Sequence, residues 1–337
     1  MSKVVPVTLV KDDTTRWDQN VTEALGPSAR VLAAAVARRH YLAGESKVDI
    51  AGALGISRFK VARLLDLAHE LGIVRIEIAS DQIVDLELSE EVREAWELHH
   101  CTVVLGHGAD AVAREDLGRT AAELLCEVVT DKDVLGLPWA RSVSDMIRSI
   151  TAFPRIPIVQ LSGSVVVPDE TTSPVDIVGR IARIAGGEAH LFYAPLVLDD
   201  ATSATVMRRQ PSVASALAAA DRVTIAVAGI GAWAPGQSTV YDTIGPEDRA
   251  EAVAAGVVGE VMGIYYGADG APVQTHLTDR MVTLTGDRLR AVPEVIGIAR
   301  GRNKAQAVRG ALRSGLLKSL VIDTEIAQAL LAGDWTR

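Results

Sequence analysis

The stretch from Lys47 to Gly72 reads KVDIAGALGISRFKVARLLDLAHELG and predicts two short helices joined by a tight turn. The first, over 47–54, is rich in apolar residues and stops before Gly55, a residue suited to a backbone position with positive φ. The second starts after Ser57 as its N-cap, and its apolar residues recur at helical spacing. This arrangement predicts a helix-turn-helix.

The second of these helices carries basic residues on the side away from its apolar residues. A recognition helix enters the major groove of DNA by its N-terminal end, where Arg and Lys reach guanine edges or phosphates. We therefore expect Arg58 and Lys60 to contact bases or phosphates, and Arg63, one turn on, to contact a phosphate. Ser57, at the start of the helix, belongs to the same candidate DNA-binding surface. A merely solvated basic face is the alternative.

Upstream, SARVLAAAVARRHYLAG over 28–44 predicts another helix, capped by Ser28, with Val31, Ala35 and Leu42 near one side. Residues 28–79 are then an all-α helix-turn-helix domain of the winged type, with IVRIEI over 73–78 as the strand or wing that leads out of it. Residues 1–27 match no pattern and are treated as an N-terminal arm.

The charge distribution sets this segment apart from the rest of the chain. Between Ser28 and Arg75 there are eight Lys or Arg against four Asp or Glu, a net of +4, whereas the whole chain carries −9 and the remainder therefore −13. A basic segment attached to a larger acidic body indicates a polyanion-binding head on a module with another task.

Length and composition restrict the class of protein. The 337 residues, 48% hydrophobic and 23% charged, exclude disordered, collagen-like and coiled-coil proteins and predict about two domains. The longest nearly apolar run, over 223–234, is too short for a membrane span. Asp12 and Asp13 come before any hydrophobic run of signal-peptide length, so we expect no export. Two cysteines provide neither a disulfide framework nor metal-ligand spacing. We expect a cytoplasmic protein without a membrane partner, a metal or a cofactor.

Beyond a boundary near Ala79, we expect a linker helix over 80–100 and an effector-binding and oligomerisation domain over 101–337. In the latter, short apolar runs such as CTVVL, DVLGL, RVTIAVAG, EVMGIYY and PEVIGIA alternate with helical stretches. This alternation predicts a doubly wound parallel α/β sheet.

Ligands of such sheets lie beyond the carboxyl ends of the strands, so the loops after the apolar runs hold the candidate site. Helix N-termini with Arg, Lys and Ser suit a phosphorylated or polyhydroxylated ligand. Strand-to-helix turns also use Gly and Ser for structural reasons alone. The candidate effector-binding residues are Arg141, Ser142, Gly163, Ser164, Gly229, Gly231, Glu260 and Lys304.

The run YLAGESKVDIAGALGISRFKVARLLDLAHELGIVRIEI and the later blocks DVLGLPWARS, VQLSGS, GVVGEVMG and ARGRNKAQAVRGALRSG resemble the SorC/DeoR-type sugar-responsive bacterial transcriptional regulators, over about 28–331. The resemblance implies a ribose-phosphate-isomerase-like α/β effector domain, usually in tetrameric repressors or activators of sugar-use operons that bind phosphorylated sugars. Operator DNA, a small carbohydrate or its phosphate, and further copies of the chain, as a dimer or tetramer, are the implied partners.

The resemblance also implies roles for single residues. Arg141 and Ser142 occupy the phosphate-cradling turn, Glu260 the position of a sugar-hydroxyl acceptor, and Lys304 that of a phosphate or hydroxyl donor. Gly163 and Ser164 form a second loop. The chain departs from the family pattern in two places: Ala140 replaces a glycine, and a block that usually reads GG..KA here reads RGRNKA over 300–305. We therefore expect a sugar, a sugar alcohol or a sugar phosphate, with Arg300 or Arg302 adding positive charge.

Other classes remain as alternatives. A sugar-phosphate isomerase-like enzyme could use Glu260 and Lys304 as an acid/base pair, but the spacing identifies no full catalytic set and leaves the helix-turn-helix unexplained. A dinucleotide enzyme fits G-x-G-x-x-A over 229–234, but Pro235 and Gly236 interrupt the helix that should follow. A metal-responsive regulator would need clustered ligands. The sequence favours a DNA-binding transcriptional regulator, with no catalytic residues, controlled by a carbohydrate effector.

Overall fold

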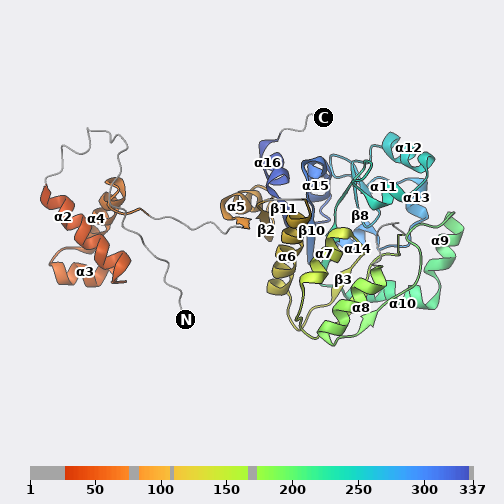
Figure 1. Cartoon of the computed structure of the whole chain (residues 1–337), viewed down its shortest axis with the longest axis horizontal. Helices are drawn as coiled ribbons and strands as arrows, with labels where there is room; N and C mark the ends of the chain where they lie inside the picture. The colour runs from red at the N-terminus through yellow and green to blue at the C-terminus, as the bar shows by residue number, and fades with distance from the viewer. Residues whose placement is uncertain (1–26, 76–82, 107–109, 166–172, 334–337) are drawn as a thin grey trace. The chain divides into compact units, whose positions relative to one another are not determined.

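The computed structural model describes residues 27–75, 83–106, 110–165 and 173–333 (Figure 1). The chain divides into two units, over 1–79 and 80–337, which are described separately below. The expected N-terminal arm, apart from Pro27, and residues 76–78 of the expected wing lie outside the described residues.

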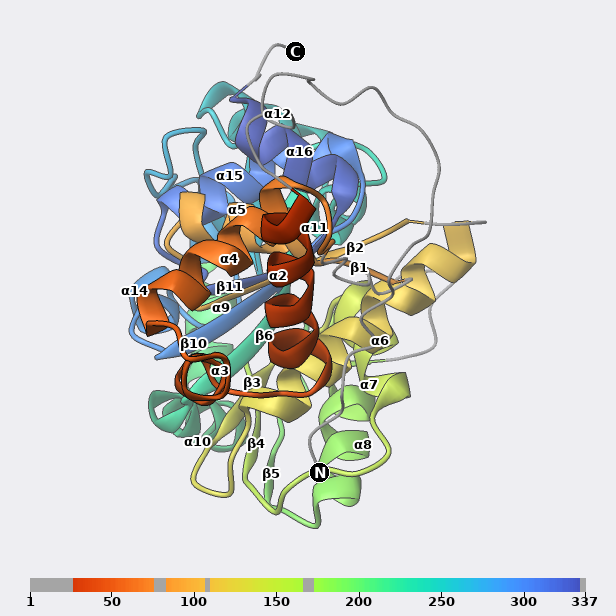
Figure 2. The same ribbon diagram turned by 90° about the vertical axis from the view of Figure 1, so that its left-hand side faces the viewer.

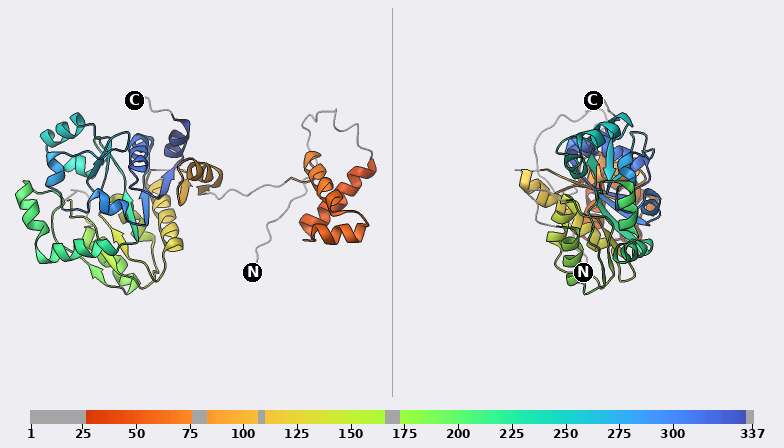
Figure 3. Two further views of the ribbon diagram at one scale, coloured as in Figure 1. Left: turned by 180° about the vertical axis from the view of Figure 1, so that it is seen from behind. Right: turned by 90° about the vertical axis from the view of Figure 1, so that its right-hand side faces the viewer.

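The N-terminal unit is helical, as its red to orange ribbon shows from behind in Figure 3. It consists of α2 (Pro27–Ala37), the π-helix η1 (Arg38–Leu42), α3 (Lys47–Leu54) and α4 (Arg58–Glu70). The predicted turn is confirmed: Gly55 has φ 65°, and the Ser57 side chain accepts a hydrogen bond from the backbone N–H of Lys60. A helix-turn-helix follows because a glycine ends α3 where left-handed backbone is required.

The buried face of α2 differs from the one expected. Val31 and Leu42 are 69% and 49% exposed, and Ala35 is exposed as well. The core of this unit instead takes Ala33, whose neighbours on the same face are Val36 and Ala37. Ala33 and Ala37 let α2 pack closely on α4, so this side of the helix, with Val36, faces inward instead of the side that carries Val31.

The second unit is built on an eight-stranded sheet whose order, within the described residues, is β1-β2-β11-β10-β6-β3-β4-β5. β1 pairs antiparallel with β2, and the other neighbours pair in parallel. The strands are β1 (Val84–Asp85), β2 (His100–Val104), β3 (Leu135–Leu137), β4 (Ile158–Gln160), β5 (Ala189–His190), β6 (Ile225–Gly229), β10 (Glu294–Ile298) and β11 (Ser319–Asp323).

Helices cover both faces of this sheet, as expected for a doubly wound fold (Figure 2). α6 (Asp110–Val128), α7 (Arg141–Ser149) and α8 (Pro174–Ala185) pack on one face, and α5 (Leu86–Ala95), α15 (Ala305–Arg313) and α16 (Thr324–Ala332) on the other. Successive strand residues alternate between the two cores: Leu320 belongs to one and Val321 to the other. The helix expected as a linker is α5, and its Val92 is fully buried in this unit.

The remaining elements lie outside the eight-stranded sheet and the six helices named above. They are α9 (Ala201–Arg208), α10 (Pro211–Ala219), η2 (Ala220–Arg222), α11 (Thr239–Thr243), α12 (Pro246–Ala254), α13 (His276–Asp279), α14 (Gly286–Arg290) and η3 (Arg302–Lys304), with β7 (Gly231–Ala232), β8 (Gly259–Val261) and β9 (Ile264–Tyr266). Among the described residues no helix combines the length and the apolar character that crossing a membrane requires.

One strand expectation is wrong. EVMGIYY is not a strand of the parallel sheet but the hairpin of β8 and β9, in an antiparallel sheet ordered β7-β8-β9. The reason is the turn at Met262 and Gly263, whose φ values of 55° and 81° reverse the chain in two residues. Glu260 therefore lies on a strand, and not in a loop after one.

Candidate functional site

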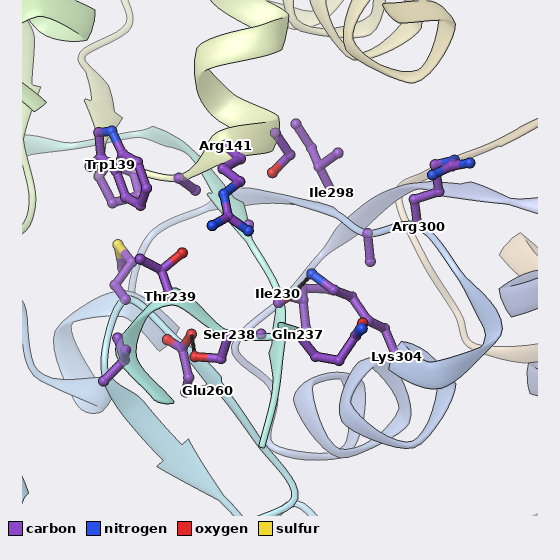
Figure 4. Close-up of a pocket in the computed structure, with 18 of the residues that line it drawn as sticks. Trp139, Arg141, Ile230, Gln237, Ser238, Thr239, Glu260, Ile298, Arg300 and Lys304 are labelled. Carbon is purple, nitrogen blue, oxygen red and sulfur yellow. Dashed lines mark hydrogen bonds between the residues drawn. The ribbon is translucent and has the colours of Figure 1, made fainter. Parts of the chain in front are cut away.

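A cavity of about 350 Å³ opens where β3, β6 and β10 end (Figure 4). These three strands are neighbours in the sheet, and their carboxyl ends share one edge. β3 and β6 are neighbours in the sheet. The next strand after β3 is β4, which lies beyond β3, whereas the next parallel strand after β6 is β10, which lies beyond β6 in the opposite direction. The cavity thus lies at the point where the strand order reverses, the usual ligand position in such sheets.

Most of the predicted effector-binding residues line this single cavity. They are Arg141, Ser142, Gly163, Gly229, Gly231, Glu260 and Lys304. Ser164 lies next to the cavity wall instead of in it, because its backbone pairs with the segment around Pro195: its N–H donates to the carbonyl of Ala194 at 2.9 Å. Of the two additional arginines considered, Arg300 lines the cavity, whereas Arg302 is exposed outside it.

The turn after β3 directs the start of α7 at the cavity. Ala140 is the N-cap residue of α7 and carries no side-chain oxygen to cap the first N–H groups. Its extended backbone (φ −157°, ψ 150°) suits any residue, so replacing glycine here introduces no strain. Figure 4 shows the Arg141 side chain extending from this helix into the cavity. A helix N-terminus and a guanidinium therefore face the same space, which favours an anionic group.

Two glycines, Gly229 at the end of β6 and Gly231 at the start of β7, keep this space open. A Cβ on Gly229 would lie 2.8 Å from the Ala140 Cβ and 2.9 Å from the Ser142 Oγ, closer than real side chains pack. A Cβ on Gly231 would overlap the Glu260 carboxylate. Glycine at the end of β6 therefore lets the chain approach the α7 turn, and glycine at the start of β7 leaves room for the Glu260 carboxylate.

The Glu260 carboxylate is buried at the base of the cavity. It accepts hydrogen bonds from the Ser238 Oγ and from the Gly263 N–H, each at 2.9 Å. Burial raises the pKa of Glu260, while these two hydrogen bonds and the charge of Lys304 act in the opposite direction. The carboxylate is held in one orientation and can accept a further hydrogen bond from a ligand hydroxyl.

Lys304 lines the same cavity as Glu260 (Figure 4). Its Nζ donates to the carbonyl of Ile230 at 2.7 Å. Burial lowers the pKa of Lys304, the charge of Glu260 raises it, and the charge of Arg141 lowers it again. An anionic ligand between Lys304 and Arg141 would relieve the repulsion between these two cations.

Among the cavity residues that were not selected from the sequence as site residues, three bear on its chemistry. Ser238 precedes α11, and only its role as the N-cap of that helix is visible in the sequence. Trp139 presents a ring in the wall after β3. Asp110, at the start of α6, pairs with Arg300 across the cavity rim, with 2.7 Å between the guanidinium nitrogen and the carboxylate oxygen.

Asp323 holds the loop after β10 from outside the cavity. This residue ends β11, and its two carboxylate oxygens accept hydrogen bonds from different segments. One binds the Gly301 N–H at 2.6 Å and the other the Ile326 N–H at 3.0 Å. Asp323 therefore caps α16 and fixes the loop that carries Arg300 and Lys304.

Replacing Asp323 by alanine is expected to loosen that loop. We expect Asp323→Ala to lower the free energy of unfolding by about 1–2 kcal/mol, because an N-cap and a second backbone hydrogen bond are lost together. Hydrogen exchange of the Gly301 amide should accelerate. The matched control is Asp200→Ala, which removes an exposed cap of α9. Unchanged exchange at Gly301 in Asp323→Ala would contradict the assigned role.

Stability should depend on pH through Glu260. Because burial raises its pKa above the ordinary 4.5, the native state binds a proton more tightly than the unfolded chain does. The free energy of unfolding should therefore fall as the pH rises above about 4.5, and Glu260→Gln should remove this part of the fall.

Urea unfolding at about pH 5 and about pH 8 measures this effect. The stability of the unsubstituted chain relative to Glu260→Gln should be greater at the lower pH. Glu247→Gln, the same change at an exposed residue of α12, is the control and should follow the unsubstituted chain. Equal pH dependence in Glu260→Gln and the unsubstituted chain would contradict the expectation.

The predicted DNA-contacting residues lie at the start of α4, in the N-terminal unit. Arg58, Lys60 and Arg63 are exposed, while the opposite face of α4 is buried through Val61 and its helical neighbours Leu64, Leu65 and Ala68. The Ser57 Oγ accepts from the Lys60 N–H at 3.2 Å, so its oxygen serves as the helix cap. The helix thus presents a cationic N-terminal end to solvent.

Comparisons with known proteins agree with this organisation. Residues 80–332 match the sugar-binding domain family (Sugar-bind). The transcriptional regulator LsrR of Escherichia coli K12 is 28% identical over 305 residues, covering 88% of this chain and 93% of that protein. LsrR of Klebsiella pneumoniae is 27% identical over 322 residues, covering 94% of this chain and 97% of that protein.

Among solved structures, the full-length sorbitol operon regulator SorC from Klebsiella pneumoniae superposes with a TM-score of 0.70 at 23% identity. The superposition covers 90% of this chain and 99% of the SorC chain. The relatives are regulators, which supports a regulator over the isomerase alternative. The chain therefore belongs to the sugar-binding domain family, and its similarity to LsrR over most of both chains supports a transcriptional regulator.

Proposed function

We propose that this regulator binds an operator through α4 and that a small carbohydrate held in the cavity controls that binding. The observation that carries the proposal is the convergence of Arg141, Lys304 and Glu260 on one cavity at the reversal of strand order. The cationic start of α4 supports operator binding, because the phosphate backbone of DNA attracts a positively charged surface.

The chemistry of the cavity favours a polyhydroxylated ligand with an anionic group. Arg141 and the start of α7 suit a phosphate, and Lys304 lies close enough to share its charge. Glu260 can accept a hydrogen bond from a hydroxyl, and the Trp139 ring offers an apolar surface to the C–H face of a sugar. A volume of about 350 Å³ fits a single small molecule.

Control of DNA binding then works by population shift. An effector that binds one arrangement of the chain more tightly than another changes the spacing of two recognition helices relative to operator half-sites. This requires at least a dimer, and we propose a dimer or tetramer on a partly symmetric operator. Analytical ultracentrifugation that detects only monomer, with and without DNA, would contradict this part.

Fluorescence anisotropy tests the proposal as a whole. The purified chain is titrated onto DNA from upstream of its own gene, with and without sugars, sugar alcohols and their phosphates. Sorbitol and its phosphate belong in the panel because the relative SorC is named as a regulator of a sorbitol operon. Specific, salt-sensitive binding that one compound alters supports the proposal. Binding no tighter than to random DNA under every ligand would count against it.

A further inference from the structure

Phe59 is a large apolar side chain left in solvent at the start of α4. It is 69% exposed, although the chain has only three phenylalanines. Phe192 is fully buried and Phe153 packs against a hydrophobic core. A phenylalanine at this position therefore loses the burial that the other two obtain.

The direction of Phe59 follows from the helix itself. At 100° per residue, the buried residues of α4 point on average opposite to Phe59. Arg63, one turn later, shares the outward side with Phe59 and is exposed as well. Within the described part of the N-terminal unit, the ring points away from the core at the N-terminal end of α4.

Cationic side chains surround this ring. The Arg58 guanidinium lies over it, with 5.0 Å between the guanidinium carbon and the ring centroid, and Lys60 follows in the same turn. This surface therefore consists of one apolar ring flanked by positively charged side chains. A second copy that paired through this same surface would bring like charges together, whereas DNA would meet the cations with phosphates.

In the major groove, thymine is the base that presents an apolar group, its 5-methyl. The N-terminal residues of a recognition helix are those that reach base edges. We infer that Phe59 contacts a thymine 5-methyl and makes thymine preferred at one position of each operator half-site. This inference rests on the proposed DNA-binding function and adds to it a specificity-determining residue.

The test compares operators that differ by one methyl group. The full chain first selects its site from a random duplex pool, and each thymine of the enriched site is then replaced in turn by deoxyuridine. Loss of a buried methyl should weaken binding about fourfold at the contacted thymine and not at the others. Phe59→Ala should bind the thymine operator more weakly and lose the distinction between thymine and deoxyuridine there. Phe59→Leu should keep part of the preference for thymine over deoxyuridine.

Val48→Ala is the matched control, because Val48 is 64% exposed but lies on α3. It should keep the distinction in full. The inference is overturned if Phe59→Ala still distinguishes thymine from deoxyuridine. It is also overturned if Phe59→Ala changes the oligomeric state and not the base preference. A site that enriches but shows no deoxyuridine effect overturns the inference alone. A pool from which no site enriches overturns DNA binding and the inference together.

Discussion

Arg58→Ala is expected to weaken operator binding by about 10- to 100-fold while leaving the affinity for the effector unchanged. Arg58 is exposed in the first turn of α4, where a guanidinium can bind a guanine edge in two places. The loss of one such contact, about 1–3 kcal/mol, corresponds to a weakening of about this size. Anisotropy on the selected operator measures the loss.

The control for Arg58 is Arg30→Ala, which removes the same charge from an exposed position of α2. It should cost less than about threefold, because only a distant charge is lost. The salt dependence separates two roles of Arg58. A phosphate contact lowers the slope of log K against log salt by about one in the variant, and a base contact leaves the slope nearly unchanged. Native affinity in Arg58→Ala would remove this residue from the interface.

Lys304→Met is expected to raise the effector concentration needed for half-maximal response by about 10- to 100-fold. Methionine keeps most of the buried aliphatic stem but removes the ammonium that faces the cavity beside Glu260. Hydrogen bonds to charged groups contribute about 1.5–3 kcal/mol, which corresponds to this range. Operator affinity without effector should remain that of the unsubstituted chain, because Lys304 lies in the other unit.

The matched control is Lys318→Met. The Lys318 Nζ also donates to a backbone carbonyl, that of Gly315 at 3.1 Å, but Lys318 does not line the cavity. Its effector response should equal that of the unsubstituted chain. A dose–response curve of Lys304→Met that superposes on that of Lys318→Met would show that the effector does not use Lys304.

Local features of the N-terminal unit were predictable because each depends on neighbours within a few residues. Gly55 ends α3 with positive φ, and Ser57 caps α4 three residues before the N–H group that it binds. The buried side of α2 was not predictable. Whether Val31 or Ala33 faces inward depends on how closely α2 approaches α4, which is a property of the packed unit.

In the second unit, the sequence located the ends of the strands but not every residue that meets there. Arg141 and Lys304 lie in the turns that follow β3 and β10, so the rule for parallel sheets selected them. Ser238 reaches Glu260 from a segment 22 residues earlier, and Asp323 holds Gly301 from 22 residues later. No local pattern reports such pairs, because they depend on which segments the fold places side by side.

The sequence by itself determined the helix-turn-helix, the α/β alternation and the family resemblance, because these depend on periodicity, caps and spacing along the chain. The tertiary structure decided that β8 and β9 form a hairpin and that Glu260 enters the cavity from it. It also decided that Ser164 stays outside the cavity and that Phe59 remains in solvent. The physical reason is that strand order and packing set these positions, and both arise only when distant segments meet.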